Sequence, residues 1–343
     1  MPTDPELLTQ SYDFTLPDDL IAAYPAHPRD HARLLVYNRA DNTITHTYFY
    51  ELENYLPKGC ALIFNDTKVI KARLFGEKPS GGKIELLINR ALNAYDINVY
   101  IRGRVKAATT LLFDKDIKAV VKELKEDGSR IVNFYQNEKL LRFEDLLPVI
   151  EEIGHIPLPP YINREDNAQD ANEYQSVFAK EEGAVAAPTA SLHFTDEQHE
   201  RICKNYQHAY VTLHVGSGTF KPVETDIITK HPMHAEYYSI SKEAKQILDS
   251  TTPVLCVGTT STRTVEYYAK HGRKTEGEAN LFLHPKNRPS RVNHLLTNFH
   301  LPKSTLLMLV ASFVGLEKTK ELYAEAIKEK YRFYSYGDAM LIL

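Results

Sequence analysis

Tryptophan is absent from this chain of 343 residues, and cysteine and methionine occur only three and four times. The cysteines, Cys60, Cys203 and Cys256, are odd in number and far apart, which fits neither a disulfide framework nor the ligand spacing of a zinc site. We therefore expect reduced cysteines, packed in the core of a cytoplasmic protein.

Long hydrophobic runs are also missing. The apolar run Thr305–Leu316 has about twelve residues, whereas a membrane span needs roughly twenty. The first residues, MPTDPELLTQSYDF, lack the basic and apolar regions of a secretory signal. We expect no membrane association and interpret the apolar run as a buried helix.

A basic excess is missing as well, because the net charge is −4. This balance argues against a protein that wraps nucleic acid without selectivity. It does not exclude a local basic patch, because attraction to phosphate acts within about one Debye length, roughly 10 Å.

Short runs of β-forming residues, separated by turn signals, occupy residues 71–142. Asp127-Gly128 lies between two of these runs and is a strong hairpin signal. We predict that residues 71–142 form an inserted small antiparallel β-barrel domain.

The other residues, 1–70 and 143–343, alternate strand and helix patterns, which is typical of an α/β main domain with a mixed sheet. Thr195 and Gln198 have the spacing of a capping box at the start of one helix. In open α/β sheets, ligands bind beyond the carboxyl ends of the strands. Polar residues at strand ends are therefore the candidates for a site.

The first candidate is HVGSGTFKPV, in which a strand ends at His214. Gly216 and Gly218, with Ser217 between them, would let a ligand approach the backbone closely. The third glycine of a dinucleotide-binding fingerprint is missing. A glycine turn beside a core histidine is therefore an alternative interpretation.

The second candidate is VLCVGTTSTRTVEYY, in which hydroxyl residues lead from a strand into a helix. The N–H groups and the positive dipole end of that helix suit an anion, which Thr259, Thr260 and Arg263 would hold. The alternative is an ordinary helix start with a solvated arginine.

The third candidate is LLTNFHLPKSTLLMLVASFVG, in which polar residues precede the apolar run. Ser304 or Thr305 can cap the apolar helix, but a cap does not explain Asn298 and His300. These two residues flank Phe299 and would share one face of an extended segment. We interpret them as pocket residues that the buried helix anchors.

The fourth candidate is FNDTKVIKAR, in which Asp66 ends a strand and a basic cluster follows. In HPMHAEYY, His234 and Glu236 could face one way as an acid/base or ligand pair. No HExxH or CxxC pattern accompanies them, so we expect no metal site. A P-loop, a GxSxG elbow and a kinase signature are also missing, which removes the commonest enzyme classes.

Taken in order, these segments resemble one family along nearly the whole chain, the S-adenosylmethionine:tRNA ribosyltransferase-isomerases of queuosine biosynthesis. The motifs that carry the resemblance are RLLVYNR, FNDTKVIKARLFG, GGKIELL, GHIPLPPYI, YQSVFAKEEGAVAAPTASLHFT, HVGSGTFKPV, HPMHAEYYSI, VGTTSTRTVE, LLTNFHLPKSTLLMLVASFVG and YRFYSYGDAMLI. The chain departs from the family pattern at Ser191 and mainly in one loop, residues 279–293, so acidic roles in that loop do not carry over.

The resemblance implies a mixed α/β domain with an inserted β-barrel and an unusual reaction. The ribosyl group of S-adenosylmethionine is transferred to 7-aminomethyl-7-deazaguanine at the wobble position of a tRNA with a GUN anticodon. Its isomerisation gives epoxyqueuosine, and adenine and methionine are released. S-adenosylmethionine is a co-substrate here, no cofactor is implied, and we expect a cytoplasmic monomer.

This chemistry needs a base that removes a proton from the 5′ carbon beside the sulfonium. Near neutral pH a histidine or a carboxyl group with a raised pKa suits that task. In order of preference the candidates are His214, His193 and Asp338. For S-adenosylmethionine itself, the candidate binding residues are Gly216, Ser217, Gly218, Thr259, Thr260, Arg263, Asn298 and His300.

For the tRNA, basic side chains would contact phosphates and aromatic rings would stack on an unpaired base. The candidate substrate-binding residues are Asp66, Lys68, Arg73, His234, Glu236, Tyr336, Arg288 and Arg291, and further candidates are Lys71, Arg102, Arg104, Lys106, Lys286 and Tyr334. Two rival functions remain open, an S-adenosylmethionine-dependent tRNA methyltransferase and a non-catalytic RNA-binding protein.

Overall fold

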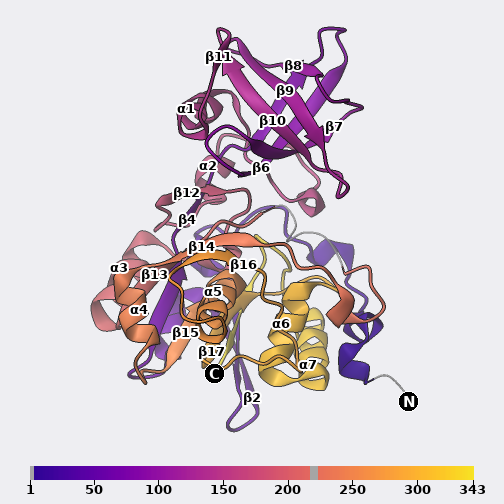
Figure 1. Cartoon of the computed structure of the whole chain (residues 1–343). Helices are drawn as coiled ribbons and strands as arrows, with labels where there is room; N and C mark the ends of the chain where they lie inside the picture. Colours follow the sequence, from indigo (N-terminus) through magenta and orange to yellow (C-terminus); the bar gives the residue numbers. More distant parts are fainter. Residues whose placement is uncertain (1–3, 217–222) are drawn as a thin grey trace.

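The computed structural model describes residues 4–216 and 223–343, which form a main body and a smaller barrel (Figure 1). A nine-stranded sheet runs through the main body, and its strands in spatial order are β16 (Glu276–Ala279), β14 (Glu236–Ile240), β13 (His208–Leu213), β3 (Ala61–Asn65), β15 (Val254–Val257), β17 (His294–Asn298), β18 (Ala339–Ile342), β1 (Arg33–Asn38) and β2 (Thr43–Tyr48). The central pairs β13–β3, β3–β15 and β15–β17 are parallel, whereas most outer pairs are antiparallel. The predicted α/β class with a mixed sheet is confirmed.

Both faces of this sheet are covered, because its central strands are apolar on both sides. In β3, Ala61 and Ile63 belong to one core cluster, and Leu62 and Phe64 belong to the other. The helices of the main body are α2 (Asp170–Glu173), α3 (Asp196–Asn205), α4 (Lys242–Leu248), α5 (Gly258–Lys270), α6 (Thr305–Val314) and α7 (Leu316–Lys328). As predicted, Thr195 caps α3 by accepting a hydrogen bond from the N–H of Gln198.

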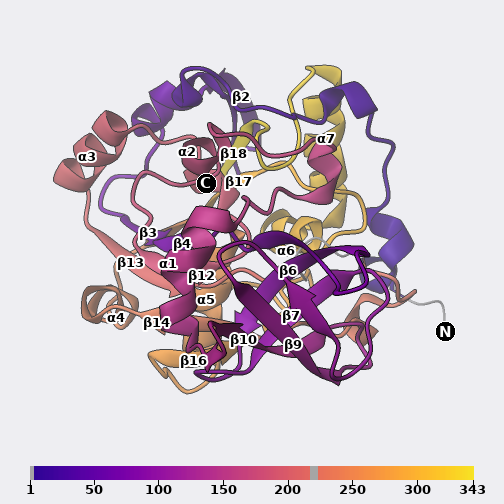
Figure 2. The same cartoon turned by 90° about the horizontal axis from the view of Figure 1, so that it is seen from above.

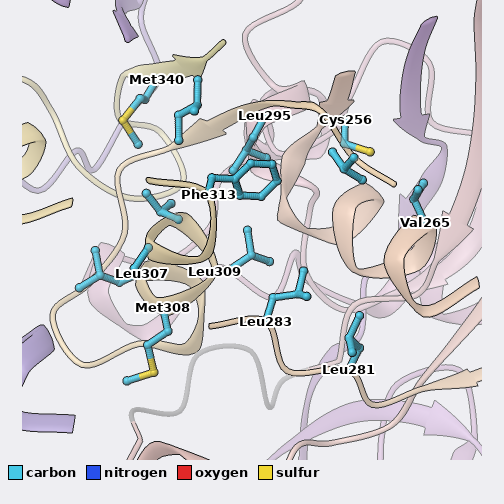
Figure 3. Close-up of a cluster of buried hydrophobic side chains, with 14 of the residues drawn as sticks. Cys256, Val265, Leu281, Leu283, Leu295, Leu307, Met308, Leu309, Phe313 and Met340 are labelled. Atoms are coloured by element: carbon cyan, nitrogen blue, oxygen red, sulfur yellow. The ribbon is translucent and has the colours of Figure 1, made fainter. Parts of the chain in front are cut away.

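Helix α6 is the apolar run, and it is buried as expected. Its side chains Leu307, Met308, Leu309 and Phe313 lie in one cluster with residues of β15, β17, α5 and the 279–293 loop (Figure 3). Ser304 caps its first turn by accepting a hydrogen bond from the N–H of Leu307. Within the described parts of the chain, no helix is long and apolar enough to cross a bilayer.

The barrel is antiparallel and closed, as predicted. Its strands are β5 (Arg73–Glu77), β6 (Lys83–Ala91), β7 (Ile97–Arg102), β8 (Thr110–Leu112), β9 (Ile117–Leu124), β10 (Arg130–Gln136) and the short β11 (Lys139–Leu140). Pairing of β9 with β10 closes six of them into a ring, and the hairpin between these two strands contains Asp127-Gly128. Gly128 has a φ of +85°, which explains the glycine in that turn.

The barrel unit extends beyond the expected boundary at residue 142. Helix α1 (Phe143–Ile153) buries Leu146 and Ile150 in the barrel core, and Gly154 follows its last turn. Between the two bodies, β4 (Thr67–Val69) pairs with β12 (Glu181–Ala184). Seen from above, the barrel lies over the side of the main body that carries β14 and β16 (Figure 2), and the ion pair Arg90–Glu278 links barrel and β16.

Candidate active site

A pocket lies beyond the carboxyl ends of β13, β15 and β17, and we call it the inner pocket. Its empty space, open solvent included, amounts to about 690 Å³. Its lining comprises Tyr161, Ala186, Ala187, Pro188, Thr189, Ala190, Val215, Gly258, Thr259, Thr260, Thr297, Asn298, Phe299, His300, Leu301, Ser304, Leu306, Tyr334 and Ser335. The structure thus brings together four of the predicted S-adenosylmethionine-binding residues, Thr259, Thr260, Asn298 and His300.

The first turn of α5 supplies polar backbone to the inner pocket. Gly258 has a φ of +91°, which lets the chain turn sharply from β15 into the helix. The N-cap residue Val257 has an apolar side chain, and no side chain among the described residues caps this helix. The hydroxyls of Ser261, Thr262 and Thr264 bond back to carbonyls one turn earlier. The N–H groups of the first turn therefore suit an anion.

The end of β17 is fixed by hydrogen bonds rather than by packing alone. Asn298 accepts from the Thr189 hydroxyl at 3.0 Å and donates to His193 Nε2 at 3.0 Å. Burial lowers the pKa of His193 to about 3, with Arg332 and Arg29 adding to the effect, so its ring is neutral and Nε2 can accept. His300 bonds Thr297, and burial lowers its pKa to about 3 as well.

An aromatic pair forms another wall of the inner pocket. The rings of Tyr161 and Tyr334 stack with centroids 4.0 Å apart. Tyr334 has a φ of +73°, a costly conformation for a residue with a side chain. It persists because Asn298 donates to its carbonyl and because Gly337 lacks a Cβ, which would lie 2.5 Å from the carbonyl oxygen of Arg332.

A second hollow, which we call the interdomain cleft, adjoins the inner pocket between the barrel and the main body. It has an empty volume of about 1280 Å³. Its lining comprises Asn89, Arg90, Ala91, Leu92, Asn98, Tyr100, Asp127, Phe143, Glu182, Gly183, His214, Gly216, His234, Ala235, Glu236, Tyr237 and Glu278. His214 and Gly216 line the cleft while Val215 lines the inner pocket, so the segment after β13 separates the two.

His214 is held on three sides. Its Nδ1 lies 2.8 Å from the Thr67 hydroxyl, and Tyr237 stacks on its ring at 5.8 Å. Gly183 has a φ of +147°, and a Cβ there would lie 3.0 Å from the Cε1 and Nε2 atoms of His214, so a larger residue would be strained and would crowd the ring. Burial lowers the pKa of His214, which keeps the imidazole neutral near pH 7 and able to accept a proton.

Glu236 ties the same segment to α5. Its carboxylate accepts from the N–H of Gly216 at 3.0 Å and from Arg263 Nη1 at 2.5 Å. Arg263 is buried beside Glu236 and also donates to the carbonyl of Leu281, so it does not face the inner pocket. The expected contact of Arg263 with the methionine carboxylate is therefore corrected to a clamp between β14 and α5.

Two of the three candidate bases lie outside both hollows as the structure describes them. The Asp338 carboxylate accepts from the backbone N–H groups of Arg33 and Arg332, and its side chain is buried. His193 uses Nε2 to orient Asn298. Both side chains thus bond other groups of the protein, whereas His214 lines the interdomain cleft.

Several predicted substrate-binding residues have structural partners instead. Tyr336 is 2% exposed and donates to Asp170, so its buried ring cannot stack on a base. Arg291 donates to the last carbonyls of α4 and the turn after it, at Ile247, Leu248, Ser250 and Thr252. Asp66 accepts from Thr212 and lines a different hollow, and burial raises its pKa.

The remaining cations are nearer the surface. Lys68 pairs with Glu182, Lys71 with Glu151, and Arg73 with Glu85. Arg102, Arg104, Lys106 and Arg288 are exposed, and Lys286 pairs with Asp4 and Glu6. His234 is exposed at the cleft, whereas Ser217 and Gly218 lie outside the described residues.

Three residues with a clear place at the site were missed by the sequence reasoning. Asn65, fully buried, bonds both backbone groups of Leu213 and the hydroxyl of Thr260, and so joins β3, β13 and α5. Thr67 and Gly183 hold His214. The signal lay in FNDTK: alternation along a strand puts Asn65 and Thr67 on the face opposite to Asp66.

The described residues contain no group of His, Cys, Asp and Glu side chains that could hold a metal ion. The inner pocket has an anion-binding helix start and an aromatic wall, and the neutral, fixed side chain of His214 lies at its boundary with the cleft. This set suits a ligand that carries a carboxylate and an aromatic base, and a proton transfer at the boundary between the pocket and the cleft.

The chain is similar to known proteins along nearly its whole length. A family model described as queuosine biosynthesis protein matches residues 9–342. The chain is 69% identical to the S-adenosylmethionine:tRNA ribosyltransferase-isomerase of Sulfurimonas denitrificans, and 59% identical to that of Nitratiruptor sp., covering 98% of this chain and 99% of each relative. A crystal structure of S-adenosylmethionine tRNA ribosyltransferase from Thermotoga maritima is 35% identical, with a TM-score of 0.54, over 97% of this chain and all of that one.

Proposed function

Because the chain belongs to the queuosine biosynthesis family of S-adenosylmethionine:tRNA ribosyltransferase-isomerases, we propose that the inner pocket and the cleft are where it performs this reaction. The enzyme transfers and isomerises the ribosyl group of S-adenosylmethionine onto 7-aminomethyl-7-deazaguanine in tRNA, and adenine and methionine leave. The comparisons do not favour the two alternatives, a methyltransferase and a non-catalytic RNA-binding protein.

S-adenosylmethionine lies in the inner pocket as a co-substrate, and the enzyme needs no further cofactor. The N–H groups at the start of α5 bind the methionine carboxylate, a role supported by the lack of a capping side chain among the described residues there. Tyr334 and Tyr161 face the same pocket and provide a surface for adenine. Asn298 and His300 also line this pocket.

His214 is the base that removes the proton from the 5′ carbon of S-adenosylmethionine. Its position at the boundary of pocket and cleft supports this role, because the sulfonium nucleoside and the tRNA base must meet there. When Nδ1–H of His214 donates a hydrogen bond to the Thr67 hydroxyl, the lone pair of Nε2 is left to accept the proton of the substrate. Loss of adenine from the resulting ylide precedes attack by the amine of the tRNA base.

The tRNA enters through the interdomain cleft with its wobble base turned out of the anticodon stack. Exposed cations on the barrel, Arg102, Arg104 and Lys106, contact its phosphates. The substrate tRNA has a GUN anticodon, and the enzyme acts as a monomer in the cytoplasm.

The observation that carries this function is the convergence of three strand-end segments, carrying Val215, Thr259 and Asn298, on one pocket. Adenine release is the direct test, measured with S-adenosylmethionine and a tRNA bearing the modified base. We expect adenine and methionine in equal amounts and a rate at least tenfold lower for His214→Ala. S-adenosylhomocysteine as the product would indicate the methyltransferase, and binding without adenine release the RNA-binding protein.

A further inference from the structure

The barrel side of the interdomain cleft carries an irregularity in strand β6. Ile88 pairs with Val99 and Arg90 with Asn98, so one extra residue, Asn89, is bulged out of the ladder. Bulges occur next to active sites, where they redirect a side chain. The bulge directs Asn89 out of the barrel wall and into the lining of the cleft.

Hydrogen bonds inside the barrel fix which way the amide of Asn89 points. The Asp127 carboxylate can only accept, and the Ser129 hydroxyl donates to it at 2.7 Å. Ser129 must therefore accept from Asn98 Nδ2, at 2.8 Å, which turns Asn98 Oδ1 toward Asn89. Asn98 Oδ1 accepts from Asn89 Nδ2 at 2.8 Å, and this leaves Asn89 Oδ1 as the end of the amide that faces outward.

That oxygen lies against the segment that follows β13. It is 3.3 Å from the position that a Cβ of Gly216 would take, and Glu236 Oε1 is 4.0 Å from the same position. Two acceptor oxygens, one from each body, thus lie close to the backbone of a glycine two residues after His214. A carbonyl oxygen accepts two hydrogen bonds, so Asn89 Oδ1 can serve a ligand in addition to a protein donor.

We propose that Asn89 is a specificity-determining residue, whose side-chain oxygen accepts a hydrogen bond from the primary amine of the tRNA base in the cleft. The inference rests on the proposed function, because it needs the amine-bearing base to lie beside His214. It gives the barrel a part in selecting the reacting base, beyond contacts with tRNA phosphates.

The test compares two anticodon stem-loop RNAs, one with the aminomethyl base and one with unmodified guanine at the same position. Asn89→Ala is expected to weaken binding of the amine-bearing RNA by about tenfold or more, the usual value of a hydrogen bond to a charged group. Binding of the guanine RNA and of S-adenosylmethionine is expected to stay unchanged. Fluorescence anisotropy and calorimetry give these dissociation constants.

Two further variants separate contact from folding. Asn133→Ala is the matched control, because this barrel asparagine donates to Tyr95 and Asp96 and is not among the described cleft residues. It is expected to bind both RNAs as the wild type does. Ser129→Ala removes the acceptor that orients Asn98, and we expect a smaller loss than for Asn89→Ala, again only with the amine-bearing RNA.

Equal weakening of both RNAs by Asn89→Ala, or no weakening of either, would overturn the inference. Wild-type adenine release is measured on the same preparation. An active wild type whose RNA selectivity survives Asn89→Ala refutes this inference alone, whereas a wild type that releases no adenine refutes the proposed function and the inference with it.

Discussion

At the residue scale, the site depends on side chains that hold other side chains. Thr67 and Gly183 hold His214, His193 holds Asn298, and Asn65 holds Thr260. Each supporting residue lies on a segment other than the one it supports. Sequence reasoning found the supported residues, because polar groups at strand ends stand out, and it proposed a direct role in the chemistry for His193.

Thr67 provides a test of this support. Thr67→Val is nearly isosteric but cannot bond Nδ1 of His214, so we expect a roughly tenfold fall in the single-turnover rate of adenine release. Thr67→Ser keeps the hydroxyl and is expected to restore most of the rate. The affinity for S-adenosylmethionine should be the same in all three proteins.

The pH profile shows whether Thr67 acts through the histidine. Because burial lowers the pKa of His214, the wild-type rate is expected to rise with pH through a pKa below 6.5 and then to stay level. In Thr67→Val, the pH at which the rate rises should differ from that of the wild type. If Thr67→Val has a lower rate but the rate rises at the same pH as in the wild type, the role of Thr67 is purely structural.

At the element scale, the start of α5 is positioned by its neighbours in the sheet. Asn65 at the end of β3 bonds it from one side, and Glu236 of β14 bonds Arg263 one turn further along. The sequence predicted the strand, the helix and the anion site at their junction. It could not show that Arg263 has a partner inside the protein, because Glu236 comes 27 residues earlier on another strand.

The clamp between α5 and β14 predicts a non-additive effect on stability. Arg263→Met leaves the buried carboxylate of Glu236 without its cation, which we expect to lower the free energy of unfolding by about 3–5 kcal/mol. The double variant Arg263→Met, Glu236→Gln removes both charges and should be more stable than the single one. Urea unfolding measures the free energy of unfolding of each variant. Equal losses of stability in the single and the double variant would contradict a coupling between Arg263 and Glu236.

At the scale of the whole molecule, the barrel and the main body enclose a cleft that neither forms alone. Asn89 and Tyr100 from the barrel face His214 and Glu236 from the main body. Inside the main body, the buried neutral His300 lines the inner pocket, and the buried neutral His193 bonds Asn298 of that pocket. Protonation of these histidines would therefore disturb both the site and the stability of the fold.

His193 and His300 make the stability of the main body sensitive to acid. Their pKa values of about 3 lie below the unfolded value of 6.5. Between pH 3 and pH 6.5 these histidines are protonated in the unfolded chain but not in the folded protein. Their contribution to the free energy of unfolding is therefore complete above pH 6.5 and is lost as the pH falls. From pH 6.5 to 5 each histidine should cost about 2 kcal/mol.

Replacing one of these histidines tests the assignment. His300→Asn cannot titrate, so the free energy of unfolding should depend less steeply on pH between 6.5 and 5 than in the wild type. Urea unfolding at several pH values gives the slope of the unfolding free energy against pH for both proteins. A loss of stability that is the same at every pH does not affect this slope. Identical slopes would mean that the pKa of His300 is the same in the folded and the unfolded protein.

The sequence by itself determined the α/β class, the inserted barrel, the buried helix α6 and the family, because periodicity, turn residues and motifs are local properties of the chain. It also located the strand ends at which polar residues gather. Only the tertiary structure decided which of those residues meet. Whether Arg263, Asp338 and Tyr336 reach a ligand or a partner depends on segments far away in the chain, and so does the place of Asn89 opposite Gly216.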